Sequence, residues 1–254
     1  MKRIDLHIHT TTSDGTFTPE EVVREASRLG LAAVAITDHD SAAGYPAAAA
    51  EGEKCGLEVV PGIEISTKFR SAVHILGYYI DVDSPALEEV LEWMHRDREE
   101  RNVKLCAMLR ASGVDIDIER MHARFGDLVG RPHFAEIMIE NGMARDMNDA
   151  FERLLNKNRP YFIPRQFLPI ERSIEIIREA GGTAVLAHPF QYRLDDAAQT
   201  AYLEALAAEY GLVRTGGSDF HGAIKGEIRL GEGKGGLNVP YAFLEELRSR
   251  RAKT

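Results

Sequence analysis

The sequence predicts an α/β fold, and three observations support this. Short apolar runs alternate with helical stretches up to residue 83, the pattern of strand–helix units that build a parallel sheet. The same alternation resumes at residue 169, after a stretch in which only helical periodicity is present. A chain of 254 residues is long enough for one large α/β domain that carries an insertion.

The first strand–helix units have clear local signals. The strand IDLHIHT leads to a helix in which Thr18 is the expected N-cap, Pro19 the first residue, Glu21 the partner in a capping box and Gly30 the terminator. The next predicted elements are the buried strand LAAVAITDHD, an alanine-rich helix near residues 42–54, and the strands LEVVPGIEIST and AVHILGYYI.

The rest of the chain divides the fold into two parts. Residues 84–168 show helical patterns alone and predict a small helical insertion, a lid or substrate subdomain, between barrel segments 1–83 and 169–254. After it we expect the strand GGTAVLAHP, a strand in LVRTGGSDFHG and a final helix from about Pro240.

Composition excludes several classes of protein. The formal net charge of −9 argues against a broad basic surface for duplex DNA. No stretch approaches the roughly 20 apolar residues of a membrane span, and the N-terminus lacks the apolar run of a secretion signal. Cys55 and Cys106 are too far apart for a thiolate zinc motif and do not indicate a disulfide framework. A cytoplasmic protein without a membrane partner is expected.

Histidines and carboxylates gather where predicted strands end. The carboxyl ends of strands are where α/β barrels and open parallel sheets bind ligands, so we expect these side chains to converge on one rim. Nitrogen and oxygen ligands without thiolates suit zinc, iron or manganese. Nine ligands exceed the need of one tetrahedral ion and indicate two or three divalent ions. The nine candidates are His7, His9, Asp14, His39, Glu64, His74, His188, Asp219 and His221.

The motifs DLHIHTTTSDGTFTPEE, AITDHD, VPGIEIST, VHILGY, AVLAHP and GGSDFHG resemble, in order, those of the PHP (polymerase and histidinol phosphatase) family. The similarity is strongest to its stand-alone branch of 3′,5′-nucleoside bisphosphate phosphatases and short-RNA 5′→3′ exonucleases. It implies a distorted (β/α)7 barrel, a helical insertion and a trinuclear metal site. The implied ligand sets are His7, His9, Glu64 and Asp219 for one ion, Glu64, His74 and His188 for a second, and Asp14, His39 and His221 for a third.

One departure from the family pattern lies after Asp196. Similar sequences have a further βα unit between the AHP motif and the last strand, whereas here LDDAA leads almost directly to QTAYLEALAAEYG. The barrel is therefore expected to lack one βα unit. We expect rearranged chain or a neighbouring subunit to fill the gap; the sequence does not indicate the oligomeric state.

The resemblance implies hydrolysis of nucleotide phosphate esters by a metal-activated hydroxide. The substrates would be 3′,5′-bisphosphonucleotides, short 5′-phosphorylated oligoribonucleotides, or both, and the sequence does not separate these. Arg131 and His133 begin a helix in the insertion, where a guanidinium and the helix N-terminus favour a phosphate.

Other candidates for substrate contact carry weaker signals. Lys68 and Arg70 follow the Glu64 strand and are more typical of a solvated loop, while Arg159, Tyr161 and Arg165 could clamp a base or pack in the core. We expect the remaining histidines, His95 and His122, at the surface of the insertion.

Two other functional classes stay open. An amidohydrolase-like enzyme acting on a C–N bond would also use a metal-lined barrel rim, but no strand end here offers the metal-bridging lysine typical of that superfamily. A non-catalytic, metal-stabilised module would fit a family member that had lost ligands. The complete set of nine ligands argues against it.

Overall fold

The structure is a computed structural model that describes residues 2–68, 73–188, 197–213 and 215–251. Arg70 and the segment 189–196, where the missing βα unit was expected to begin, lie outside the described residues. The elements follow one another in the order β1 (Arg3–Ile8), α1 (Pro19–Arg28), β2 (Ala33–Ile36), α2 (Tyr45–Cys55), β3 (Glu58–Lys68), β4 (Val73–Tyr78), α3 (Pro85–Ala111), α4 (Ile118–Phe125), α5 (Arg131–Glu140), α6 (Met147–Ala150), the π-helix η1 (Phe151–Leu155), β5 (Leu168–Pro169), α7 (Ile170–Glu179), β6 (Thr183–Leu186), α8 (Ala197–Glu209), the 3₁₀-helix η3 (Gly222–Lys225), β7 (Val239–Pro240) and α9 (Ala242–Arg251).

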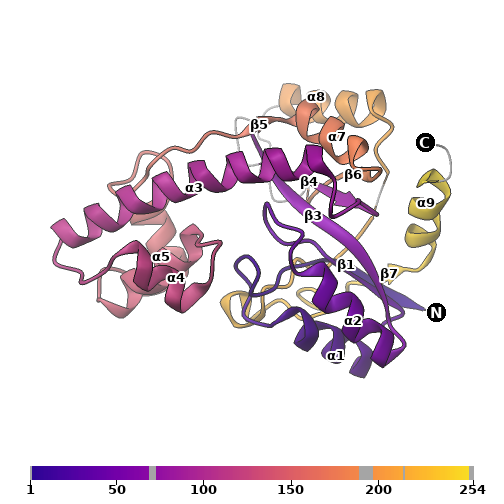
Figure 1. Ribbon diagram of the computed structural model, residues 1–254, viewed down its shortest axis with the longest axis horizontal. Coiled ribbons are helices and arrows are strands. Elements are labelled where there is room, and N and C mark those ends of the chain that lie inside the picture. Colours follow the sequence, from indigo (N-terminus) through magenta and orange to yellow (C-terminus); the bar gives the residue numbers. More distant parts are fainter. Residues whose placement is uncertain (1, 69–72, 189–196, 214, 252–254) are drawn as a thin grey trace.

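The predicted α/β class is confirmed, in the form of a curled, incomplete barrel (Figure 1). The sheet has the order β6-β4-β3-β2-β1-β7, and β5 also pairs with β3. The strands β1, β2 and β3 are parallel, as expected, but β4 is antiparallel to both β3 and β6. The parallel pairing expected of βα units holds for β1 to β3 but not for β4, nor for β7, which pairs antiparallel with β1. Only residues 69–72 lie between β3 and β4, too few for the crossover that a parallel return needs.

The first helix, α1, has the predicted local structure. The Thr18 hydroxyl accepts the Glu21 N–H at 3.2 Å, and the Glu21 carboxylate accepts the Thr18 N–H at 2.8 Å, which completes the capping box. Gly30 follows the helix with φ of 69°, a left-handed conformation that favours glycine. The buried face of α1, which includes Val22 and Val23, packs in one core cluster with Ile8.

The segment 215–220 replaces the strand expected in LVRTGGSDFHG. It runs beside β1, because Leu6 N–H donates to Gly216 O at 3.2 Å and Asp219 N–H to His7 O at 2.9 Å, but it forms no regular strand. Two features explain this. A Cβ at Gly217 would lie 2.3 Å from the His7 nitrogen, and Asp219 has φ of 59°, which breaks the extended backbone.

The C-terminal helix α9 covers the side of the barrel between β6 and β1. Among the described residues that follow β6, α8 is the only regular element before Gly216. Leu244 and Leu247 of α9 are fully buried in the same core cluster as Leu6 and Val185, each contributing about 1.5–3 kcal/mol by burial. Figure 1 shows α9 near the C-terminus, beside β7. The absence of a βα unit and the means by which a gap would be filled stay predictions.

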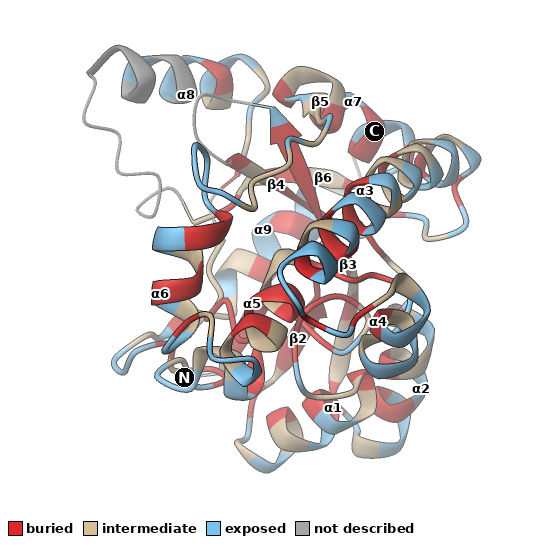
Figure 2. Cartoon of the chain, turned by 90° about the vertical axis from the view of Figure 1, so that its left-hand side faces the viewer, coloured by how far each residue is buried: buried red, intermediate tan, exposed pale blue. Residues whose placement is uncertain are grey.

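The long helix α3 belongs to two cores. Its first half packs with α7 in one cluster, through Leu87 and Met94, and its second half packs with α5 in another, through Leu105 and Leu109. The second cluster consists of residues between Leu105 and Ile163 only. Figure 1 shows α4 and α5 beside the far end of α3, and Figure 2 shows buried and exposed residues alternating along this helix. We propose that 84–168 is an inserted unit anchored on the barrel through α3.

Candidate metal and phosphate site

All nine predicted side chains lie together at one rim of the barrel. His7 is in β1 and His9 follows it, His39 follows β2, and His188 follows β6. His74 is the second residue of β4 rather than a residue at its end. Because β4 runs antiparallel to its neighbours, its beginning lies at the rim where the parallel strands end.

Glu64 is at the centre of this rim cluster, in β3, and is completely buried. Its Oε2 lies 3.1 Å from His9 Nε2 and 3.2 Å from His7 Nε2, and its Oε1 lies 3.0 Å from both His74 Nδ1 and His188 Nε2. His39 Nδ1 is 3.1 Å from Oε2. One carboxylate thus faces five imidazoles.

The other two carboxylates lie on either side of His9. Asp219 Oδ1 is 3.4 Å from His9 Nε2 and 3.6 Å from His7 Nε2. Asp14 is 3.5 Å from His221 Nε2, 3.7 Å from His9 Nδ1 and 3.9 Å from His39 Nε2. His9 therefore connects the two carboxylates.

The donor set and its spacing fit divalent metal ions. Two ligands at about 2.0–2.1 Å from a tetrahedral ion lie about 3.3 Å apart, close to the separations around Glu64. His39 Nδ1 and Glu64 Oε2 are buried and form no hydrogen bond within the described chain, although they lie 3.1 Å from each other. Two ligands of a common ion are arranged in this way.

Four overlapping groups could each hold an ion. They are His9, Asp14, His39 and His221; His7, His9 and Asp219; His7, Glu64 and His188; and His39, Glu64 and His74. The groups differ from the implied ligand sets in placing His39 with Glu64 and His74. The number of ions, their identity and the assignment of ligands stay predictions.

Burial and mutual charge set the protonation of this cluster. Burial raises the pKa of Glu64, but the neighbouring His7, His39 and His74 outweigh it and hold the pKa well below its usual range. Burial lowers the pKa of His39 to about 3 and that of His221 to about 4. Both imidazoles are therefore neutral near pH 7, the form that binds metals.

His9 has the opposite tendency. Burial favours its neutral form, but the nearby carboxylates of Asp219 and Glu64 outweigh burial and raise the pKa of His9 to about 10. Metal binding at His9 would therefore release a proton.

Strain and supporting contacts hold the rim in place. His188 and Asp219 have positive φ angles of 24° and 59°, an unusual backbone conformation that concentrates at functional sites. Asp38 accepts hydrogen bonds from Thr10 N–H at 2.7 Å and the Ser13 hydroxyl at 2.6 Å, which fixes the loop that carries Asp14. Such outer partners orient metal ligands.

Sequence reasoning missed Lys225, in η3, which contacts the rim cluster. Its Nζ donates to Asp219 Oδ2 at 2.7 Å, while Oδ1 of the same carboxylate faces His7 and His9. Lys225 and Asp219 are separated by six residues, and no strand or helix periodicity indicates their contact.

Arg131 and His133 lie at the start of α5, in the insertion. The His133 ring is buried, accepts the Gly130 N–H through Nδ1 at 2.9 Å and stacks on Phe125 at 4.6 Å between ring centroids. Burial lowers the pKa of His133, and the charge of Asp14 opposes this, so the ring is within electrostatic reach of the rim. The Arg131 guanidinium lies 5.6 Å from the Phe151 ring centroid.

Three weaker expectations can be compared with the structure. Of the two readings of Arg165, packing in the core is the one with contacts here: its buried guanidinium donates to Asp97 at 3.2 Å and to Met94 O at 3.1 Å. His95 is half-buried and bonds to Asp40 O at 2.7 Å, so it is not a free surface residue. Lys68 is exposed.

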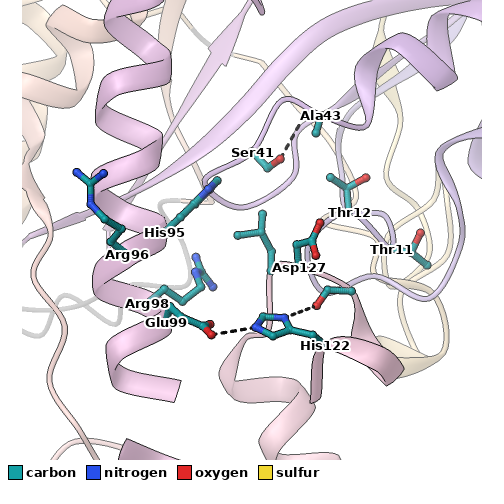
Figure 3. Close-up of a pocket in the computed structure, with 12 residues that line it drawn as sticks. Thr11, Thr12, Ser41, Ala43, His95, Arg96, Arg98, Glu99, His122 and Asp127 are labelled. Carbon is teal, nitrogen blue, oxygen red and sulfur yellow. Dashed lines mark hydrogen bonds and ion pairs between the residues drawn. The ribbon is translucent and has the colours of Figure 1, made fainter. Parts of the chain in front are cut away.

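A cavity of about 610 Å³ adjoins the rim and contains none of the nine candidate ligands. One side of the cavity is lined by barrel loops that carry Thr12 and Ser41. The other side is lined by α3 and by the chain that follows α4, as Figure 3 shows. His122 also lines the cavity. Its Nε2 lies 3.0 Å from Glu99 Oε1 and its Nδ1 lies 3.0 Å from Gly126 O. The cavity leaves space beside the rim for a group larger than phosphate.

Comparison with known proteins identifies the family. A family model described as the PHP domain matches residues 5–171. The chain belongs to the PHP domain family. This PHP protein is 36% identical over 222 residues to the 5′-3′ exoribonuclease Rnm of Salmonella typhimurium, covering 86% of this chain and 72% of the relative. It is 36% identical over 195 residues to the 3′,5′-nucleoside bisphosphate phosphatase of Chromobacterium violaceum, covering 76% of this chain and 68% of the relative.

Solved structures support the same fold. A metal-dependent phosphoesterase from Bifidobacterium adolescentis matches with a TM-score of 0.82 and 27% identity over 98% of this chain and 96% of that one. An amidohydrolase from Chromobacterium violaceum, solved with sulfate and no metal, matches with a TM-score of 0.80 and 31% identity over the same shares of the two chains. The distorted PHP barrel expected from the sequence is confirmed. None of the helices in the described part of this PHP protein has the length and apolar character of a membrane span.

Proposed function

We propose that this PHP protein is a metal-dependent phosphoesterase that hydrolyses 3′,5′-bisphosphonucleotides and short 5′-phosphorylated oligoribonucleotides. Phosphate-ester hydrolysis is the activity of its named relatives and neighbour. The observation that carries the proposal is the convergence of six histidines and three carboxylates on one rim. The nine residues would act as ligands of two or three ions of zinc, iron or manganese.

The chemistry follows from this set of side chains. Bound divalent ions polarise phosphate oxygens and lower the pKa of water from ~15.7 toward ~7. Glu64 would hold neighbouring ions at a fixed separation, because its two oxygens face different histidines. Lys225 holds the far oxygen of Asp219, so the near oxygen keeps its direction toward His7 and His9.

Arg131 and His133 would bind a second phosphate of the substrate. Both lie at the N-terminus of α5, where the helix dipole favours an anion, and His133 is in electrostatic reach of Asp14. One named relative acts on a nucleoside bisphosphate. A substrate with two phosphates would place one on the rim and the other at α5.

The test is phosphate release from adenosine 3′,5′-bisphosphate by purified protein of measured metal content with added manganese, beside a 5′-phosphorylated RNA dinucleotide. Cleavage of the bisphosphate alone identifies a nucleotide phosphatase. Cleavage of the dinucleotide to mononucleotides adds exonuclease activity. If a fully metal-loaded sample catalyses neither reaction, the proposal is contradicted.

A C–N hydrolase is the second candidate, since one structural neighbour is named an amidohydrolase. The same preparation tested on cyclic amides and N-acyl substrates distinguishes the two. Turnover of these without phosphate release from any nucleotide would favour the second candidate.

A further inference from the structure

Asp5 is a buried carboxylate that the proposed chemistry does not use. It lies in β1, two residues before His7, and is completely inaccessible to solvent. Within the described chain, none of the four groups that could hold a metal ion includes it. A buried carboxylate destabilises a protein unless hydrogen bonds compensate it, so the groups that donate to Asp5 indicate what it holds in place.

Three backbone N–H groups donate to Asp5. Ser218 N–H donates to Oδ1 at 2.8 Å, and His7 N–H donates to the same oxygen at 3.3 Å. Gly231 N–H donates to Oδ2 at 2.7 Å. These donors belong to β1, to the segment 215–220 and to a loop that follows η3. One side chain therefore joins three parts of the chain, two of which carry residues of the rim cluster.

The segment 215–220 depends on such contacts, because it forms no regular strand that would hold Asp219. Backbone hydrogen bonds to β1 hold the segment on either side of Ser218, and Ser218 N–H itself donates to Asp5. Asp219 has φ of 59°, a strained conformation that persists only where the surrounding structure determines it. Asp5 thus fixes the residue immediately before a strained candidate ligand.

The loop around Gly231 is a closed turn. Arg229 N–H donates to Gly233 O and Gly233 N–H donates to Arg229 O, both at 2.8 Å. Gly231, between them, has φ of 71°, and a Cβ there would lie 2.9 Å from the Leu31 side chain. The loop contains none of the nine candidate ligands, and Oδ2 of Asp5 connects it to the segments that do.

We propose that Asp5 is a positioning residue: its carboxylate holds the segment of Asp219 against β1 and couples metal binding at the rim to the loop around Gly231. This inference rests on the metal binding that the proposed function requires. A carboxylate accepts hydrogen bonds at both oxygens, so it can hold two segments at once. While the backbone before Asp219 is fixed, its side chain keeps its direction toward His7 and His9.

The experiment compares Co²⁺ binding by wild type and by Asp5→Asn, followed through the visible absorption of the bound ion. The amide has the same shape but one acceptor oxygen, so an NH2 group faces either Ser218 N–H or Gly231 N–H. We expect Co²⁺ affinity to fall about 10- to 100-fold, the range for losing a residue that orients a metal ligand. Excess metal should restore most of the hydrolysis of adenosine 3′,5′-bisphosphate.

The control is Asp149→Asn, the same substitution in the insertion. Asp149 is also buried and accepts a backbone N–H, from Arg145 at 2.9 Å, and its ion-pair partners are Arg145 and Arg153. The thermal midpoint of both variants should fall, because each loses a charge-assisted hydrogen bond. Co²⁺ affinity should stay at the wild-type value in Asp149→Asn. An equal loss of affinity in both variants, or wild-type affinity in Asp5→Asn, would overturn the inference.

Hydrogen exchange of wild type tests the coupling without a substitution, should Asp5→Asn fail to fold. Coupling is reciprocal, so bound metal must strengthen the contacts of Asp5 by the factor with which they strengthen metal binding. Zn²⁺ should therefore slow exchange of the Gly231 amide about 10- to 100-fold. The Arg145 amide, bonded to Asp149, should exchange at an unchanged rate. Unchanged exchange at Gly231 would overturn the inference.

Metal binding and hydrolysis are measured separately, which distinguishes this inference from the proposed function. If wild type hydrolyses neither adenosine 3′,5′-bisphosphate nor the RNA dinucleotide but binds Co²⁺ at least about tenfold more tightly than Asp5→Asn, the positioning role stands and the proposed function fails. If wild type binds no Co²⁺, both are overturned.

Discussion

The rim cluster differs in its charges from a group of four arginines where the insertion meets the barrel. We call this group the arginine cluster: Arg98, Arg101, Arg131 and Arg165. Every carboxylate of the rim lies close to histidines, as Glu64 lies 3.1 Å from His9 Nε2. The arginine cluster has two carboxylates for four guanidiniums, and arginine does not readily give up its proton. The rim therefore combines carboxylates with imidazoles, several of which are neutral, whereas guanidiniums outnumber carboxylates in the arginine cluster.

This difference indicates which kind of ligand each region binds. Neutral imidazoles and ionised carboxylates attract cations, and unpaired guanidiniums attract anions. Asp40 is shared, because it binds Arg98 and follows His39 in the chain. A substrate with two phosphates would occupy both regions at once.

The largest expected effect is at the rim. Replacing Asp219 or His9 by alanine removes a proposed ligand, so hydrolysis should be abolished and bound metal should decrease, measured by turnover and metal analysis. Even the loss of a residue that only orients a metal ligand lowers metal affinity or activity about 10- to 100-fold. Asp115→Ala, at an exposed position, is the control. Unchanged turnover in both rim variants would refute the site.

The next effect tests the residue shared by the two regions. Asp40→Asn leaves Arg98 without its buried counter-ion and should cost about 3–5 kcal/mol of unfolding free energy, measured by urea denaturation. Burial raises the pKa of Asp40, but Arg98 and Arg165 outweigh it and lower the pKa below its usual value.

The stabilisation by Asp40 is therefore complete above its unfolded-state pKa of about 4. It is lost as pH falls through the lower folded-state value. The stability difference between wild type and Asp40→Asn should shrink in that acidic range. Asp83→Asn, at an exposed site, should show neither effect.

A smaller effect is expected at α5. Arg131→Ala should lower kcat/KM for substrates with two phosphates about 10- to 100-fold. The hydrolysis of p-nitrophenyl phosphate should be nearly unaffected. Arg110→Ala, exposed on α3, controls for the loss of a positive charge. An equal loss on both substrates would move Arg131 to a catalytic or structural role and weaken the contrast between the two regions.

The smallest effect concerns the outer contact of the rim. Lys225→Met releases Oδ2 of Asp219 and should lower metal affinity about tenfold, measured by competition with a chelating dye. Lys225→Arg should restore most of this affinity. Lys234→Met, which loses only a surface pair, should bind metal normally. Wild-type affinity in Lys225→Met would show that Asp219 keeps its orientation without the lysine.

The sequence alone determined the local features and the nine side chains of the rim cluster. The period of two in a strand puts His7 and His9 on one face, and the capping box of α1 involves residues three apart. Both depend on neighbouring residues only, so they are visible in the chain. The convergence of the nine side chains followed from the rule that ligands bind where parallel strands end.

Tertiary structure alone decided what depends on distant pairing. The reversal of β4 brings His74 to the rim, and α9 packs its leucines against residues of β1 and β6. The Arg98–Asp40 pair spans 58 residues, while Arg101, on the same face of α3, has no carboxylate partner among the described residues. Periodicity gives the face of a helix but not the charges opposite it, because those charges come from elements that meet only when the chain has folded.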